Sequence, residues 1–289
     1  MRQGIRLQMV SEDRRGSRVV AERPSWAPEG VDVTLPSPAR MYDALLGGWH
    51  NFEVDRNAAS MAVRKVPDLP KVALSNRAFL RRSVRFLAEN GIRQFLDIGS
   101  GIPTVGNVHE VALGVAPESR VQYVDIDAVA VAHSNAIVGG VGGVGAMEGD
   151  LRDPESLLAE LRRNSVIDLS RPVAVLLVAV LHLITDDENP WEIVRILRDS
   201  IAPGSCVVIS HLSSASRPDD AAQLGAQARN AAGVGIHFRT RKAVEALFDG
   251  WTLVAPGLVE LPQWRPESAE DVYELPGKSL GLAGVGRKS

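Results

Sequence analysis

The segment Gln94-Phe95-Leu96-Asp97-Ile98-Gly99-Ser100-Gly101 combines residue types that can hold a nucleoside. An apolar strand runs there into an acid and a Gly-x-Gly turn, and glycine lets a backbone approach a ligand closely. A second apolar strand ends in Asp125, about 24 residues after Gly101. An acid at that place can accept hydrogen bonds from both hydroxyls of a ribose. The pattern therefore predicts an adenosine site at the carboxyl end of a sheet.

The glycine spacing distinguishes two adenosine cofactors. A dinucleotide site favours G-x-G-x-x-G, whereas Thr104 stands at the third glycine position here and Pro103 stiffens the turn. Asp97, two residues before Gly99, suits the cationic amino-acid end of a ligand. S-adenosylmethionine carries an ammonium, a sulfonium and a ribose but no phosphate. We therefore expect S-adenosylmethionine as cofactor, with NAD(P) or a merely connecting turn as the alternatives.

A third acid, Asp150 in Glu148-Gly149-Asp150-Leu151, follows the third predicted strand. Ligands of open α/β sheets bind outside the carboxyl ends of the strands. We assign Asp125 to the ribose, Asp150 to the adenine amino group, and Asp97 to the amino-acid part of the cofactor. The remaining residues that we place in the cofactor site from these turns are Gly99, Ser100, Gly101, Ile126 and Leu151.

Methyl transfer from a sulfonium requires positioning, desolvation and sometimes a base. His182 follows the fourth predicted strand, where the methyl group should face its acceptor, and is the first candidate for a general base or orienting group. His211, after the fifth strand, is the second candidate, and His50 and His109 are weaker ones. A structural role is the alternative for each. The spacing of the histidines matches no metal motif, and the single Cys206 excludes a cysteine-rich zinc site.

Composition narrows the class of protein. A chain of 289 residues that is 45% hydrophobic can bury a sizeable core, and a net charge of −3 does not favour nucleic acid as a partner. The single cysteine excludes an internal disulfide and fits a reducing compartment. We see neither a membrane span of ~20 apolar residues nor a signal peptide. We therefore expect a cytoplasmic protein that does not associate with membranes.

Strands and helices alternate from residue 94 onward, which predicts a doubly wound, mostly parallel α/β sheet. We expect strands near 94–98, 121–125, 144–148, 173–180, 205–210, 251–255 and 281–287. We expect helices near 71–90, 106–114, 128–137, 154–163, 190–200, 218–232 and 240–248. Residues 1–35 are polar, and we expect them to form a disordered basic arm. We expect residues 36–289 to form one domain.

Residues 36–90 are predicted to form a helical cap on that domain. Ser37 can begin a helix with Pro38 in its first turn, and Gly47-Gly48 can end it. The segment 37–52 is dense in aromatic and polar residues, which favours the wall or lid of a site over a simple cap on the sheet edge. Asn76 and Arg77 could point at the carboxylate of the ligand or cap neighbouring loops.

Several of these segments carry a resemblance to a known family. They are residues 38–48 with 51–52 and 55–56, 75–80, 94–104 with 106–110, 123–125 with 127 and 132–133, 150–154, 203–205, 210–211 and 284–288. Over about residues 36–288 the chain resembles the bacterial S-adenosyl methyltransferases formerly described as a domain of unknown function. The resemblance implies a Rossmann-like class I methyltransferase fold, with a seven-stranded sheet whose last strand pair is antiparallel, and S-adenosylmethionine as cofactor.

The resemblance also carries site residues over by position. It supports the cofactor roles of Asp97, Gly99, Asp125 and Asp150, and family motifs that line the same cleft match Tyr42, Asn51, Asn76 and Arg77. Members usually have a charged or small residue after Gly-Gly, whereas this chain has Trp49-His50, which could alter the acceptor side. We expect a methyltransferase with a small-molecule acceptor. A catalytically silent cofactor-binding sensor or scaffold and an NAD(P)-dependent oxidoreductase are the alternatives.

Overall fold

The computed structural model describes residues 10–12, 18–20, 28, 31–103, 106–230, 235–267 and 279–289. The predicted arm therefore lies largely outside the described residues, as does Thr104. Two short strands of that arm, β1 (Val10–Glu12) and β2 (Arg18–Val20), pair antiparallel. Across the described part of the chain, none of the helices has the length and apolarity that crossing a membrane requires.

The main sheet confirms the predicted doubly wound arrangement. Its strand order is β5-β4-β3-β6-β7-β10-β8, and the short β9 also pairs with β10. Strands β3 to β7 are parallel, and β10 runs antiparallel to β7 and β8. The strands are β3 Gln94–Ile98, β4 Arg120–Asp125, β5 Val144–Glu148, β6 Ala174–Val178, β7 Cys206–Leu212, β8 Thr252–Leu253, β9 Val259–Glu260 and β10 Gly281–Arg287. Strand β9 was not predicted, because its two residues are too short to form a recognisable pattern.

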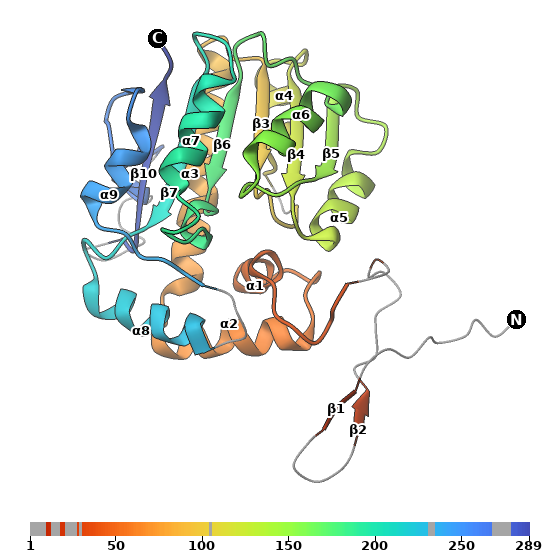
Figure 1. Cartoon of the computed structure of the whole chain (residues 1–289), viewed down its shortest axis with the longest axis vertical. Coiled ribbons are helices and arrows are strands. Elements are labelled where there is room, and N and C mark those ends of the chain that lie inside the picture. The colour runs from red at the N-terminus through yellow and green to blue at the C-terminus, as the bar shows by residue number, and fades with distance from the viewer. Residues whose placement is uncertain are drawn as a thin grey trace, which may run out of the picture.

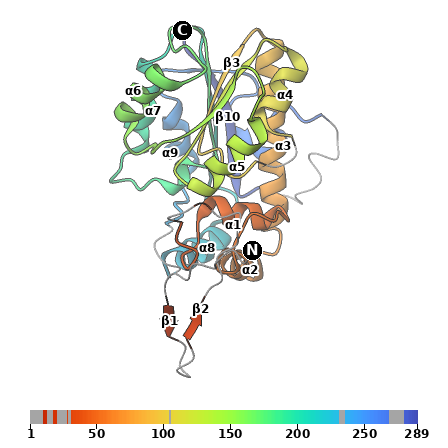
Figure 2. The same ribbon diagram turned by 90° about the vertical axis from the view of Figure 1, so that its right-hand side faces the viewer.

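Helices cover both faces of this sheet. They are α1 Pro38–Leu45, α2 Glu53–Lys65, α3 Leu69–Glu89, α4 Val108–Val115, α5 Ala128–Val138, α6 Pro154–Asn164, α7 Pro190–Asp199, α8 Pro218–Asn230 and α9 Arg241–Glu245. Three short 3-10 turns are η1 Leu181–Leu183, η2 Ala246–Phe248 and η3 Leu261–Gln263. Figure 2 shows α3 and α4 on one side of the sheet and α6 and α7 on the other.

Strand side chains alternate between two hydrophobic layers, one on each face. In β6, Leu176 and Val178 pack in the layer under α3 and α4, while Val175 and Leu177 pack in the layer under α6 and α7. Because both faces are covered, the strand must be apolar at every position. This explains why the 173–180 run shows no polar alternation.

The cap consists of α1, α2 and α8, which lie at the end of the sheet toward which β3, β4 and β6 point (Figure 1). Helix α1 contacts α2 and α3, and α2 contacts α8. Helix α2 was not predicted as a separate element. Its buried side chains are Asp55, Ala58, Ala59 and Ala62, so it presents no stripe of large apolar residues.

Candidate active site

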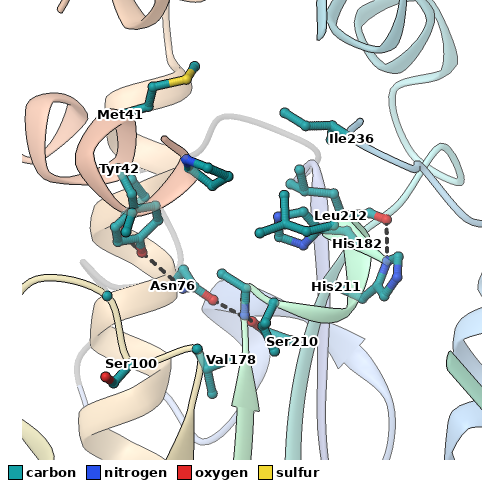
Figure 3. A pocket seen from close by; sticks show the side chains of 18 of the residues that line it. Met41, Tyr42, Asn76, Ser100, Val178, His182, Ser210, His211, Leu212 and Ile236 are labelled. Carbon is teal, nitrogen blue, oxygen red and sulfur yellow. Dashed lines mark hydrogen bonds between the residues drawn. The ribbon is translucent and has the colours of Figure 1, made fainter. Parts of the chain in front are cut away.

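A cavity of about 440 Å³ lies between the strand ends and the cap, within the size range of small-molecule sites. We call its two parts the strand-end half and the cap half. The strand-end half is lined by Arg77 and by residues 97–101, 125–127 and 149–152. The cap half is lined mainly by apolar residues of α1, α2 and α3 and by Leu224, Ile236 and Phe238. Figure 3 shows Tyr42 and Asn76 on one side and His182 and Leu212 on the other.

The glycine turn after β3 packs tightly against the segment after β6. Gly99 has a φ of 72°, and a Cβ built on it would come within 2.5 Å of Cγ2 of Val180. Gly101 has a φ of 65°, and its amide donates to Oδ2 of Asp125 at 2.7 Å. A side chain at Gly99 is therefore excluded by both space and backbone conformation. The hydrogen bond from Gly101 therefore ties Asp125 to the turn that follows Asp97.

Asp97 and Arg77 place opposite charges at one end of the strand-end half. Burial raises the pKa of Asp97 to about 7, Arg77 opposes this rise, and Asp125 adds to it. Nε and Nη2 of Arg77 are buried and have no hydrogen-bond partner among the described residues. A guanidinium in this state favours an anionic ligand, because its buried donors are otherwise unsatisfied. The pair therefore fits the ammonium and carboxylate of an amino acid.

Asp125 and Asp150 differ in their surroundings. Asp125 is buried, and burial raises its pKa to about 6, although amide donors such as that of Asp127 at 2.8 Å oppose the rise. Asp150 is half-buried, and its carboxylate accepts hydrogen bonds from Arg152, including Nη2 at 2.7 Å. These bonds lower its pKa. Ile126, 55% exposed, and the buried Leu151 line the cavity beside the two acids.

Tyr42 and Asn76 line the cavity as predicted, but they hydrogen bond to the protein. The Tyr42 hydroxyl donates to the Ala73 carbonyl at 3.0 Å and accepts from Nδ2 of Asn76 at 2.9 Å. Oδ1 of Asn76 accepts from the Ser210 hydroxyl at 2.6 Å, and that hydroxyl accepts from the Ala179 amide at 2.9 Å. This relay, Tyr42-Asn76-Ser210-Ala179, joins the cap to the turn after β6 (Figure 3). Ala179 is in the left-handed region, with a φ of 59°.

The predicted Asn51 does not reach the cavity. Its amide donates to Oδ2 of Asp43 at 2.7 Å and to the Gly48 carbonyl at 3.0 Å, so it fixes the turn after α1. Trp49 is 87% exposed, and neither it nor His50 lines the cavity. The departure from the family pattern at these two positions thus lies outside the lining of this cavity.

The structure gives the four candidate histidines different surroundings. His211 lines the cavity, but its Nδ1 donates to the Leu212 carbonyl at 2.6 Å and its Nε2 accepts from Arg239 at 2.8 Å. Burial lowers the pKa of His211 to about 4. The ring is therefore neutral and both of its nitrogens are used. His109 bonds the Tyr123 hydroxyl at 2.7 Å and, like His50, does not line the cavity.

His182 lines the cavity next to His211. It is buried, and its Nδ1 has no hydrogen-bond partner among the described residues. Burial lowers its pKa well below the usual value, and the neighbouring His211 and Arg239 lower it further. His182 is therefore neutral, and a neutral ring can accept a hydrogen bond.

Arg239, which the sequence did not single out, holds the turn that carries His182. Its guanidinium donates to the Leu181 carbonyl at 2.9 Å, to the Ile184 carbonyl at 2.8 Å and to Asp186 at 2.7 Å. These contacts cross more than fifty residues of sequence, so no local motif could reveal them. Arg239 is a positioning residue for η1.

A second buried arginine attaches the cap to the strand-end half. Arg40 donates to Asp55 at 2.9 Å and to Asp127 at 3.2 Å. Ser37 precedes α1 as predicted, but its hydroxyl donates to Asp127 and does not cap its own helix. Asp127 also begins α5, accepting from the Val129 amide at 2.8 Å. The start of α1 is therefore fixed directly over the turn after β4.

Comparisons with known proteins agree with this geometry. The family model described as S-adenosyl methyltransferase matches residues 24–289. The crystal structure of a candidate methyltransferase from Thermobifida fusca YX is 42% identical, with a TM-score of 0.85, and the match covers 92% of this chain and 100% of that one. That of a DUF574 family protein from Streptomyces avermitilis MA-4680 is 33% identical, with a TM-score of 0.84, covering 89% and 99%. No curated protein matches. The chain belongs to the S-adenosyl methyltransferase family, whose cofactor is S-adenosylmethionine.

Proposed function

We propose that this chain transfers the methyl group of S-adenosylmethionine to a small molecule held under the cap. The observation that carries the proposal is the continuity of the cavity from the strand-end acids to the apolar cap half. A concave, largely apolar site between helices and strand ends suits a small ligand.

The strand-end half would hold the cofactor. Asp97 would accept hydrogen bonds from its ammonium, and Arg77 would satisfy its carboxylate, which explains the unpaired guanidinium. Asp125 would bind the ribose hydroxyls, while Asp150, Ile126 and Leu151 would surround the adenine. When bound, S-adenosylmethionine supplies an electrophilic methyl group, so the chain needs only to orient the acceptor and manage its proton.

The alternative of a silent cofactor sensor leaves the cap half without a role. A sensor needs only the strand-end half, whereas the cavity continues past it to His182, Ile236 and Phe238. The presence of a neutral histidine in the cavity lining favours turnover.

Turnover is tested by incubating the chain with isotopically labelled S-adenosylmethionine and small-molecule extracts, and following S-adenosylhomocysteine by mass spectrometry. We expect extract-dependent product formation, with a labelled methyl group on one compound. The Asp125→Ala variant is the control for enzyme-independent methylation. Stoichiometric cofactor binding without product in any extract would contradict the proposal and favour the sensor.

A further inference from the structure

We infer that the acceptor is an uncharged, largely apolar molecule that presents one hydroxyl group to His182, and that His182 takes its proton. This inference rests on the proposed function and specifies the chemistry of the cap half. Three observations support it: the position of the charged lining residues, the hydrogen bonds that polar groups already make within the protein, and the unpartnered nitrogen of His182.

The charged lining residues gather in the strand-end half. Among the lining residues that the structure describes, Asp and Arg side chains occur only at Arg77, Asp97, Asp125, Asp127, Asp150 and Arg152. The cap half is built from side chains such as Met41, Leu45, Val72, Leu224, Ile236 and Phe238. A carboxylate or ammonium bound there would lose water without gaining an ionic partner. The lining therefore selects against ionised acceptors.

Most polar groups next to the cap half are already paired within the protein. The hydroxyls and amide of Tyr42, Asn76 and Ser210 form the relay to Ala179. Both nitrogens of His211 are bonded, to Leu212 and Arg239. These bonds fix the orientation of the wall, in which the second amide hydrogen of Asn76 and some oxygen lone pairs are the positions left over.

Among the described lining residues next to the cap half, His182 is the one with an unpartnered ring nitrogen, its Nδ1. Burial, and after it the neighbouring His211 and Arg239, lowers the pKa of this histidine and keeps its ring neutral. A neutral imidazole accepts a hydrogen bond from a hydroxyl group. A substrate with an ammonium group would instead need a carboxylate to balance its charge, and the described lining of the cap half contains none. As the hydroxyl oxygen forms its bond to the methyl carbon, the carbon–sulfur bond breaks and its electron pair stays on sulfur. The hydroxyl proton passes to the His182 ring, which later returns it to water.

Binding to the complex with S-adenosylhomocysteine tests the charge selection. After saturation with that product, the chain is titrated by calorimetry with 2-naphthol, 2-naphthoate and 2-naphthylmethylammonium. We expect 2-naphthol to bind at least about tenfold more tightly than either ion. Tighter or equal binding of an ion, or no binding of 2-naphthol, would overturn the inference. Failure to bind S-adenosylhomocysteine at all would instead contradict the proposed function.

A double-mutant cycle tests His182 itself without requiring turnover. 2-Methoxynaphthalene has the ring and the oxygen of 2-naphthol, but a methyl group replaces the hydroxyl hydrogen, so it donates no hydrogen bond. We expect the wild-type complex to prefer 2-naphthol by about 3- to 10-fold, and the His182→Phe complex to show a preference within about twofold. His182→Gln, which keeps a polar atom, should recover part of the preference, and the exposed Trp49→Ala serves as control. A preference that survives in His182→Phe would overturn the assignment.

Discussion

The two halves of the cavity are built on different principles. The strand-end half draws its charged groups from the last residues of strands, from the turns that follow them and from Arg77 of α3. It keeps the buried Asp97 near Arg77, whose Nε and Nη2 have no hydrogen-bond partner among the described residues. The cap half draws apolar side chains from helices far apart in the sequence and pairs its polar groups internally. If the proposed function holds, the charges would bind the cofactor and the absence of charge in the cap half would select the acceptor.

The largest expected effect is on the rate of methyl transfer in a His182 variant. With any acceptor that the chain methylates, His182→Phe should lower kcat by about 100-fold or more, because a positioned base contributes about that much. The measurement is initial-rate kinetics at saturating cofactor. A kcat within threefold of wild type would show that His182 is structural.

The three strand-end acids should contribute unequally to cofactor affinity. Asp125→Ala should weaken S-adenosylmethionine binding by about 2–3 kcal/mol, or about 30- to 150-fold, because a buried acceptor of ribose hydrogen bonds is lost. Asp150→Ala should cost only about 3- to 10-fold, because that acid is half-buried and shared with Arg152. Calorimetric titration of both variants decides the order. Equal losses of affinity in the two variants would show that burial does not determine how much each acid contributes to cofactor binding.

Cofactor affinity should depend on pH through Asp97. Its pKa of about 7 means that the free chain holds a proton there below neutrality, whereas the ammonium of the cofactor favours the carboxylate. Affinity should therefore fall as pH drops from 7 to 5.5, by at most about tenfold per pH unit for each acid that must lose a proton. Asp97 contributes first and Asp125, whose pKa is about 6, contributes at the lower end of this range, so binding near pH 6 should release protons. Titrations in buffers of different ionisation enthalpy measure these protons. A flat profile would contradict a protonated Asp97.

The smallest effect on binding is expected in the relay. Tyr42→Phe removes a hydroxyl that serves Ala73 and Asn76, so it should lower the free energy of unfolding by about 1–3 kcal/mol. Cofactor affinity should change less than threefold, because the hydroxyl is used within the protein. Urea denaturation and calorimetry measure the two quantities. A large loss of cofactor affinity with an unchanged free energy of unfolding would show that the Tyr42 hydroxyl contacts the cofactor.

The strand-end half was predictable because its parts are local. An apolar run followed by an acid or a glycine turn is visible in sequence, and the strands β3, β5 and β10 were predicted at their observed bounds. Parallel topology then brings the ends of β3 and β4 together. Asn51 was placed in the cleft by resemblance alone, and the structure puts it in a turn.

The helical cap was predicted, but the hydrogen bonds in its half of the cavity could not be, because they join residues far apart in the sequence. The relay joins residues 42, 76, 179 and 210, and Arg239 reaches back to η1. The sequence offered His182 and His211 as similar candidates. They are distinguished by the two bonds of His211, which donates to the Leu212 carbonyl and accepts from Arg239.

The division of the cavity is tested most directly by titrating S-adenosylhomocysteine into wild type, Asp125→Ala and His182→Phe in one calorimetric series. Wild type should bind it, Asp125→Ala should lose about 30- to 150-fold in affinity, and His182→Phe should stay within about twofold of wild type. Equal losses in the two variants, or no loss in Asp125→Ala, would contradict a charged cofactor half beside an uncharged acceptor half.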